Sequence, residues 1–224
     1  MNLEELKGKL IVSCQALPEE PLHSSFIMGR MALAAKEGGA SGIRAQSVDD
    51  INEISKVVDL PIIGIIKRYY DDSDIYITPT KKEIEELLTT RCEIIALDAT
   101  NRKRPNDEKL EDLVKLIHDG NRYAMADCST FEECKHAEEI GFDIVSTTLC
   151  GYTDYSEQYE GPNLELLKKC ANELHTPVIA EGKINTPEDL KSVYECGIFS
   201  AVVGSAITRP QLITKRFAKV LEEM

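Results

Sequence analysis

The sequence has no tryptophan, few aromatic side chains and no long apolar run. Aromatic residues make up 6% of the 224 residues. Every apolar stretch is shorter than the roughly 18 residues that a membrane span needs, and the first ten residues are charged, unlike the apolar core of a signal peptide. We therefore expect a cytoplasmic protein that does not bind a membrane.

Positive charge is also scarce. The formal net charge is −13, whereas nucleic acid and anionic membranes are bound through basic surfaces. We therefore expect no nucleic-acid partner, and an anionic small substrate would need a local positive site. Hydrophobic residues at 42% and charged residues at 29% indicate an ordinary globular protein.

The cysteine and histidine patterns lack the marks of a disulfide framework or a metal site. The seven cysteines are odd in number and include no CxxC pair, which is typical of buried thiols in a reducing compartment. None of the four histidines ends a predicted strand, where a catalytic metal would need imidazole ligands. We expect no metal and no redox cofactor.

Eight short apolar runs of strand character are present, each followed by a stretch with helical pattern. The runs are continuous rather than alternating, as expected for parallel strands that are buried on both faces. Their ends recur about every 27 residues, close to the length of one strand-and-helix unit, and no linker interrupts them. We predict one (β/α)8 TIM barrel domain over residues 1–224, with its site at the carboxyl ends of the strands. The runs end at Gln15, Arg44, Lys67, Asp98, Asp127, Thr147, Glu181 and Gly204.

The predicted helices carry start signals and apolar stripes. Thr80 and Thr130 each precede a glutamate at capping-box spacing, and Thr186 precedes a proline at the first helical position. Residues 110–117 and 212–221 each contain an apolar stripe at helical period. We expect both stripes to pack on the barrel.

The ends of the seventh and eighth runs have the composition of a phosphate site. Gly182 and Gly204–Ser205 would let backbone N–H groups approach phosphate oxygens, and Arg209 adds a cation that can bind them bidentately. The alternative is that both glycines only allow tight turns and Arg209 is solvated.

Lys67 is the candidate base. It follows the very apolar run PIIGII, and burial together with the cations Arg44 and Arg209 would lower its pKa. Glu181 lies on the opposite strand of the predicted barrel and could orient this lysine or exchange a proton with the substrate. The alternative is that Lys67 is only an electrostatic anchor.

Two aspartates and three long loops complete the predicted mouth of the barrel. Asp98 and Asp127 could accept hydrogen bonds from sugar hydroxyls or could cap loop N–H groups. The connections over residues 15–25, 68–79 and 149–162 are longer than the fold requires and hold six tyrosines that could close over a ligand. These residues favour proton abstraction next to a carbonyl of a phosphorylated small molecule.

Seven segments spread over essentially the whole chain make it similar to the bacterial N-acetylmannosamine-6-phosphate 2-epimerase family. The segments are LIVSCQALPEEPLHSSFIMGRMALAA, GGASGIRAQ, PIIGIIKR, IIALDAT, STTLCGYT, VIAEGKINTP and VVGSAITRPQLITKRF. The resemblance implies a barrel of the ribulose-phosphate-binding type and an isomerase that interconverts N-acetylmannosamine 6-phosphate and N-acetylglucosamine 6-phosphate in sialic acid catabolism. It also implies a homodimer, with the last helix exchanged or docked between subunits.

The resemblance further implies roles for individual residues. Lys67 matches the principal acid/base of the family and Glu181 the residue that supports it. Gln15, Arg44 and Asp127 match positions that hold the sugar, whereas the Gly204 loop and Arg209 match the phosphate site.

Several alternatives remain open from the sequence. The proton on the second face could come from Glu181, from a substrate hydroxyl or from Lys67 itself. Lys67 could instead form a Schiff base, as in an aldolase, or the chain could be a phosphosugar-binding barrel without catalytic activity.

Overall fold

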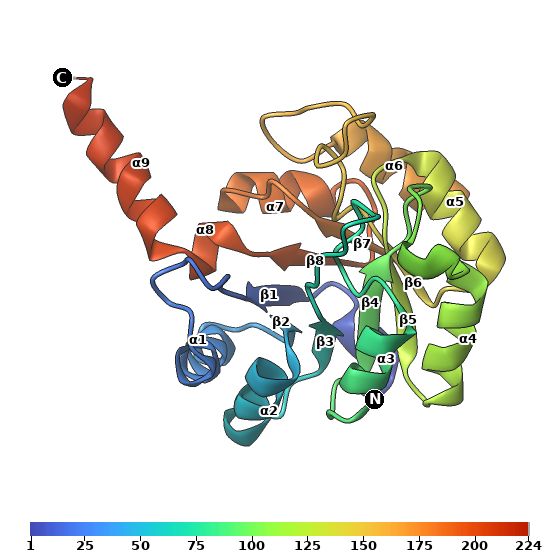
Figure 1. Cartoon of the computed structure of the whole chain (residues 1–224). Helices are drawn as coiled ribbons and strands as arrows, with labels where there is room; N and C mark the ends of the chain where they lie inside the picture. The colour runs from blue at the N-terminus through green and yellow to red at the C-terminus, as the bar shows by residue number, and fades with distance from the viewer. Residues whose placement is uncertain (224) are drawn as a thin grey trace.

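The computed structural model describes residues 1–223, and its eight parallel strands form one closed barrel in the order β1 to β8 (Figure 1). This arrangement confirms the predicted TIM barrel. The strands are β1 Leu10–Cys14, β2 Gly42–Gln46, β3 Ile62–Ile65, β4 Ile94–Asp98, β5 Tyr123–Asp127, β6 Ile144–Ser146, β7 Val178–Glu181 and β8 Ser200–Val203. Met224, the last residue of the predicted domain, lies outside the described residues.

Helices follow the strands, and most of them cover the outside of the barrel. Thr80 and Thr130 form the predicted capping boxes of α3 and α5, and the Thr186 side chain caps α7 ahead of Pro187, so these predictions are confirmed. The α-helices are α1 Ser25–Glu37, α2 Val48–Val57, α3 Lys81–Leu88, α4 Leu110–Asp119, α5 Phe131–Ile140, α6 Leu164–Glu173, α7 Pro187–Tyr194, α8 Ser205–Thr208 and α9 Pro210–Glu222; the 3-10 helices are Leu3–Leu6 and Pro105–Asp107.

The core has an inner and an outer layer. Side chains such as Ile11, Ile63 and Met125 fill the inside of the barrel, so it is packed and not a pore. The outer layer lies between strands and helices, and α4 contributes its predicted stripe through Leu113 and Ile117.

Some predicted strands are a residue or two too long. Lys67 lies two residues beyond β3, where it forms an isolated antiparallel bridge with Ile77 in the loop that returns toward α3. Ser205 is the first residue of α8. The second run is instead too short, because β2 continues two residues beyond Arg44. Arg44, Lys67 and Ser205 nevertheless all line one cavity at the carboxyl ends of the strands.

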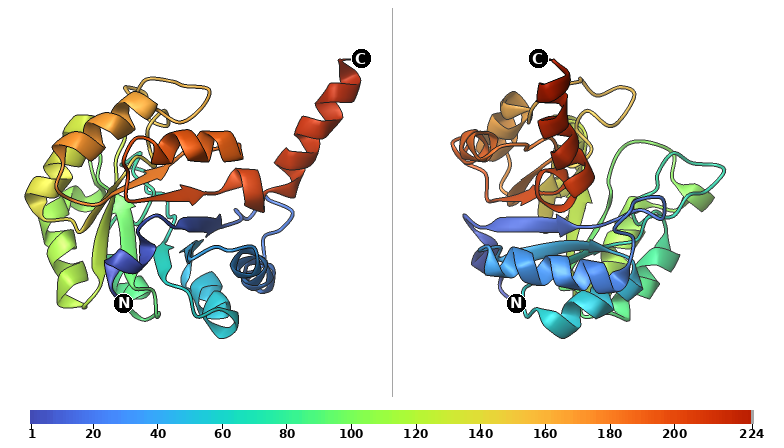
Figure 2. Two further views of the ribbon diagram at one scale, coloured as in Figure 1. Left: turned by 180° about the vertical axis from the view of Figure 1, so that it is seen from behind. Right: turned by 90° about the vertical axis from the view of Figure 1, so that its left-hand side faces the viewer.

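The prediction that the apolar stripe of residues 212–221 packs on the barrel is wrong. Helix α9 has no buried residue, and the Phe217 and Leu221 side chains are each 74% exposed. Figure 2 shows α9 projecting away from the barrel in two further views. The backbone at Arg209 (φ −118°, ψ 80°) breaks the helix between α8 and α9, and this break directs α9 away from the barrel.

The thiols are buried, as expected. All seven cysteines are free, and six of them are buried. Over residues 1–223, no group of three or more histidine, cysteine, aspartate or glutamate residues is arranged to hold a metal ion. In the same range, no helix is both long enough and apolar enough to span a membrane.

Candidate active site

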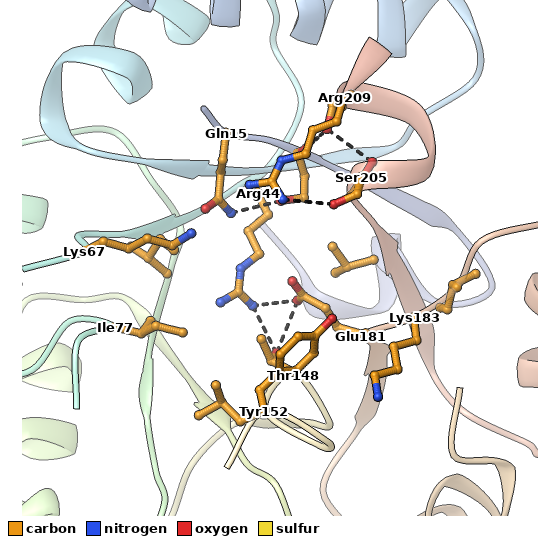
Figure 3. A pocket seen from close by; sticks show the side chains of 18 of the residues that line it. Gln15, Arg44, Lys67, Ile77, Thr148, Tyr152, Glu181, Lys183, Ser205 and Arg209 are labelled. Atoms are coloured by element: carbon orange, nitrogen blue, oxygen red, sulfur yellow. Dashed lines mark hydrogen bonds and ion pairs between the residues drawn. The ribbon is translucent and has the colours of Figure 1, made fainter. Parts of the chain in front are cut away.

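A cavity of about 410 Å³ opens at the carboxyl ends of the strands (Figure 3). Its size lies within the roughly 300–1,000 Å³ of small-molecule sites. Eight of the nine predicted site residues line it: Gln15, Arg44, Lys67, Glu181, Gly182, Gly204, Ser205 and Arg209. Asp127, the ninth, does not.

Arg44 and two carboxylates form a buried network at the base of the cavity. Arg44 and Asp127 are 1% and 0% exposed, and the Arg44 Nη2 donates to Asp127 Oδ2 at 2.5 Å and its Nη1 to Asp127 Oδ1 at 3.0 Å. The Nη1 also donates to Glu181 Oε2 at 2.7 Å, and the Thr148 hydroxyl donates to Asp127 Oδ1 at 2.6 Å. The Asp127 carboxylate therefore fixes the Arg44 guanidinium, which in turn fixes the Glu181 carboxylate in the cavity.

Lys67 enters the cavity without a carboxylate partner. Within residues 1–223, its Nζ makes no ion pair or hydrogen bond. Burial, followed by the positive charges of Arg44 and Arg209, lowers the pKa of Lys67 to about 8. This is the direction and the cause that the sequence predicted, and it makes a neutral amine accessible near physiological pH.

Glu181 reaches the same cavity with its pKa shifted in the opposite direction. Burial raises the pKa of the Glu181 carboxyl to about 7, partly opposed by the charge of Arg44. Figure 3 shows Lys67 and Glu181 entering from different sides, with the Arg44 guanidinium between them in this view. Two groups on different walls therefore change protonation state between about pH 7 and pH 8, the range in which proton transfer is most efficient.

Thr147, to which the sequence assigned no role, fixes the backbone of Glu181. Its hydroxyl donates to the Glu181 carbonyl at 3.1 Å and lies 3.3 Å from the Glu181 amide nitrogen. Asp98 has no comparable role, because it accepts hydrogen bonds from Thr100 and Arg102 and does not line the cavity. Of the two roles predicted for Asp98, a contact to sugar hydroxyls or a cap for loop N–H groups, the structure favours the cap.

The other end of the cavity is built for an anion. Arg209 lies beside Ser205, with its Nη1 donating to the Ser205 Oγ at 3.2 Å. Gly182 has φ +108°, a value that side-chain-bearing residues rarely adopt, and so brings bare backbone to the cavity wall. Helix α8 has only four residues, so the cationic side chain of Arg209, rather than a helix dipole, is the main attraction for a negative charge here.

Several lining residues were not assigned a role from the sequence. Tyr69 and Tyr76 stack with ring centroids 5.5 Å apart, and Tyr152 lines the cavity from the loop after β6. The Lys183 Nζ donates to the Tyr159 carbonyl at 2.7 Å, so this lysine joins the loop after β7 to the loop after β6. The sequence predicted only that the loop tyrosines as a group could close over a ligand, and sequence spacing gave no signal for Lys183.

The fold and the cavity define a (β/α)8 barrel protein with a lysine, a carboxyl group and an anion site at the carboxyl ends of its strands. Residues 28–223 match the family model described as "Putative N-acetylmannosamine-6-phosphate epimerase". The chain belongs to this family, which confirms the resemblance seen in the sequence.

Individual relatives agree with this assignment. The chain is 64% identical over 220 residues to "Putative N-acetylmannosamine-6-phosphate 2-epimerase" of Clostridioides difficile (strain 630), covering 98% of this chain and 99% of the relative. A relative of the same name from Clostridium perfringens (strain SM101 / Type A) is 65% identical, with 98% and 100% covered.

Solved structures agree as well. The N-acetylmannosamine-6-phosphate 2-epimerase from Clostridium perfringens is similar with a TM-score of 0.96 and 65% identity, covering 97% of this chain and 95% of that one. A thiamine phosphate pyrophosphorylase from Pyrococcus furiosus, at 21% identity and a TM-score of 0.62, shares the fold alone.

Proposed function

We propose that this protein is an isomerase that interconverts N-acetylmannosamine 6-phosphate and N-acetylglucosamine 6-phosphate, as a step of sialic acid catabolism. Its relatives carry the name of this activity at 64–65% identity over nearly the whole chain. The observation that carries the proposal is that Lys67 and Glu181, with pKa values of about 8 and 7, share one cavity with the cation Arg209.

In the first step, neutral Lys67 removes the proton at C2 of the open-chain sugar, in which C1 is an aldehyde carbonyl. Proton abstraction next to a carbonyl leaves an enolate-like negative charge. Arg44 also lines the cavity and supplies positive charge toward this intermediate. No metal or redox cofactor takes part in these steps.

In the second step, a proton is delivered to the opposite face of C2, which inverts its configuration. The Glu181 carboxyl suits this role, since its raised pKa keeps a substantial fraction protonated near pH 7. Arg44 and Thr148 orient the carboxyl through its Oε2. In the reverse reaction, Glu181 removes the proton and Lys67 delivers it.

The remaining predicted residues other than Asp127 bind the substrate. Gln15 contacts the sugar from the loop after β1, where its amide nitrogen now donates to the Ser13 hydroxyl at 2.9 Å. Asp127 acts through Arg44, because both of its oxygens are already engaged. Gly182, Gly204–Ser205 and Arg209 hold the phosphate.

The neutral amine of Lys67 also suits Schiff-base chemistry, so an aldolase is the second candidate. Borohydride reduction in the presence of substrate, followed by intact mass measurement, separates the two. A stable adduct on Lys67 would favour the aldolase. A phosphosugar-binding barrel without activity would bind the sugar and leave the configuration at C2 unchanged.

Solvent isotope exchange tests the proposed reaction directly. N-acetylmannosamine 6-phosphate is incubated with the protein in heavy water and followed by one-dimensional proton NMR. We expect deuterium at C2 and the appearance of N-acetylglucosamine 6-phosphate. Turnover without any deuterium at C2 would reject the scheme.

We further propose a homodimer, a single domain over residues 1–224 and a cytoplasmic location. The exposed apolar stripe of α9 supports the dimer, because large apolar surfaces of this kind mark protein interfaces. One barrel closed by strands from Leu10 to Val203 supports the single domain. Seven free thiols are typical of a reducing compartment.

A further inference from the structure

Arg209, the cation at the anion end of the cavity, is held by a glutamate that does not line the cavity itself. The Arg209 Nε lies 2.8 Å from Glu20 Oε1, and its Nη2 donates to Glu20 Oε2 at 3.0 Å. This bidentate pair occupies one edge of the guanidinium. The Nη1, on the other side, lies against Ser205, which does line the cavity.

The same carboxylate joins three parts of the chain. It accepts a hydrogen bond from the Leu17 N–H at 2.8 Å in the loop after β1, and one from the Gln211 side chain at 3.1 Å in the first turn of α9. Leu17 lines the cavity. Glu20 therefore fixes a cavity-lining loop, the arginine and the base of α9 relative to one another.

We propose that Glu20 is a positioning residue for the phosphate end of the site. It holds the Arg209 guanidinium by its Nε edge and leaves the Nη1 side turned toward the bound phosphate. An unrestrained arginine loses much rotamer freedom when it binds an anion, so an arginine that is already ordered binds the anion more tightly. The inference rests on the proposed function in that Arg209 is taken to bind the substrate phosphate.

The negative charge of Glu20 and its ordering of Arg209 have opposite effects on the affinity for phosphate. A carboxylate beside Arg209 reduces the attraction of this arginine for an anion, so a glutamate that merely competed with phosphate would weaken binding. Ordering predicts that removing Glu20 weakens phosphate binding, whereas competition predicts that it strengthens it. The sign of the effect therefore separates the two.

The test compares Glu20→Ala and Glu20→Gln with Glu19→Gln, a control at the adjacent, exposed glutamate. We expect Glu20→Ala to raise the KM for N-acetylmannosamine 6-phosphate roughly two- to tenfold with little change in kcat, because the lost ordering concerns binding. The dissociation constant of inorganic phosphate, measured by calorimetry, should rise by a similar factor. Glu20→Gln keeps one acceptor oxygen and should show a smaller rise, whereas Glu19→Gln should match the wild type.

A double-mutant cycle with Arg209→Ala identifies the route of the effect. If Glu20 acts through Arg209, Glu20→Ala should not weaken phosphate binding further in the Arg209→Ala background. Tighter phosphate binding by Glu20→Ala, unchanged binding, or an equal loss without Arg209 would each overturn the proposal. Calorimetry requires no turnover, so the two proposals can fail separately. If Glu20→Ala binds phosphate more weakly than the wild type but the wild type does not epimerise the sugar, the proposed function is rejected and this inference is kept.

Discussion

At the scale of single residues, burial brings the pKa values of Lys67 and Glu181 toward each other. A lysine and a glutamate ordinarily titrate about six pH units apart, whereas these two have pKa values of about 8 and 7. The causes are desolvation of both groups, two nearby cations at the lysine, and only partial compensation of the carboxyl by Arg44. Each group can then give or take a proton at modest cost.

The lowered pKa of Lys67 implies a cost in stability. Below about pH 8 the folded protein carries a buried ammonium that the unfolded chain solvates freely, and this cost disappears as the pH rises from 8 toward 10.5. We expect Lys67→Met to abolish turnover and to raise the free energy of unfolding at pH 7 by about 1–3 kcal/mol. Urea unfolding at pH 7 and at pH 9.5 measures both the gain and its decline at the higher pH.

The control for this substitution is Lys82→Met, at an exposed lysine of α3. It should keep activity and change stability by no more than about 0.5 kcal/mol. Substantial turnover by Lys67→Met would remove Lys67 from its role as the principal base.

In the proposed mechanism, the same two groups determine the dependence of the rate on pH. Proton removal needs neutral Lys67, and delivery needs protonated Glu181, so kcat/KM should rise to about pH 7, stay level to about pH 8 and fall above it. The second ionisation of a phosphate ester has a pKa near 6, which lies below the two pKa values that shape this profile. Initial rates measured from pH 6.5 to 9.5 test this profile. A rate that keeps rising to pH 8 and then stays level would exclude Glu181 as the proton donor.

At the scale of secondary structure elements, the start of α5 holds two loops of the catalytic face. Glu133 is 0% exposed and completes the capping box, accepting from the Ser129 N–H at 2.8 Å and the Thr130 N–H at 3.1 Å. Its other oxygen accepts from the Asn101 N–H at 3.1 Å and the Tyr155 hydroxyl at 2.6 Å. One helix cap thus ties the loop after β4 to the loop that carries Tyr152.

Removing this carboxylate should leave several buried donors without an acceptor. We expect Glu133→Ala to lower the free energy of unfolding by about 2–4 kcal/mol, more than an ordinary helix cap contributes. Glu132→Ala, at the exposed neighbour in the same turn, should cost at most about 1 kcal/mol through the helix dipole. Denaturant unfolding of the two variants makes the comparison, and equal losses would show that the network adds nothing beyond the charge.

At the scale of the whole molecule, the barrel is complete without α9. This last helix carries an apolar face with Phe217 and Leu221 each 74% exposed, and it projects away from the barrel (Figures 1 and 2). An isolated 13-residue helix is marginally stable in water, so its apolar face needs a surface to cover it. In the proposed homodimer, a second copy of the chain presents the same helix and supplies such a surface.

A charge on the apolar face of α9 should therefore separate the subunits. We expect Phe217→Glu to convert the proposed dimer into a folded monomer, as seen by light scattering coupled to size-exclusion chromatography. Lys215→Glu places the same side chain about 160° around the helix and should leave the dimer intact. A wild-type protein that is monomeric at micromolar concentration would contradict the dimer itself.

The barrel and eight of the residues that line the cavity could be predicted from the sequence. Strand count and spacing depend on local patterns, and in a parallel barrel the carboxyl ends of all strands meet at one mouth. Knowing that Lys67 and Glu181 follow strands was therefore enough to bring them together. The family resemblance supplied the substrate, which the patterns alone did not.

Other features of the site depend on where side chains lie in three dimensions. Asp127 and Arg44 are 83 residues apart, and only the closed barrel shows that the aspartate pairs with the arginine and not with the substrate. Glu20 and Arg209 are 189 residues apart, in two loops whose approach no local pattern signals. The stripe of α9 looks in the sequence like any core-facing stripe, because helical period records an apolar face but not what covers it.

The sequence by itself determined the number and order of the strands and the chemistry available at their ends, because these follow from local apolar patterns and from the geometry of parallel strands. The tertiary structure decided which charges neutralise one another, which carboxylates support rather than line the cavity, and which apolar face remains uncovered. Pairing and burial are set by distances between residues far apart in the chain, and the pKa values of Lys67 and Glu181 follow from those distances.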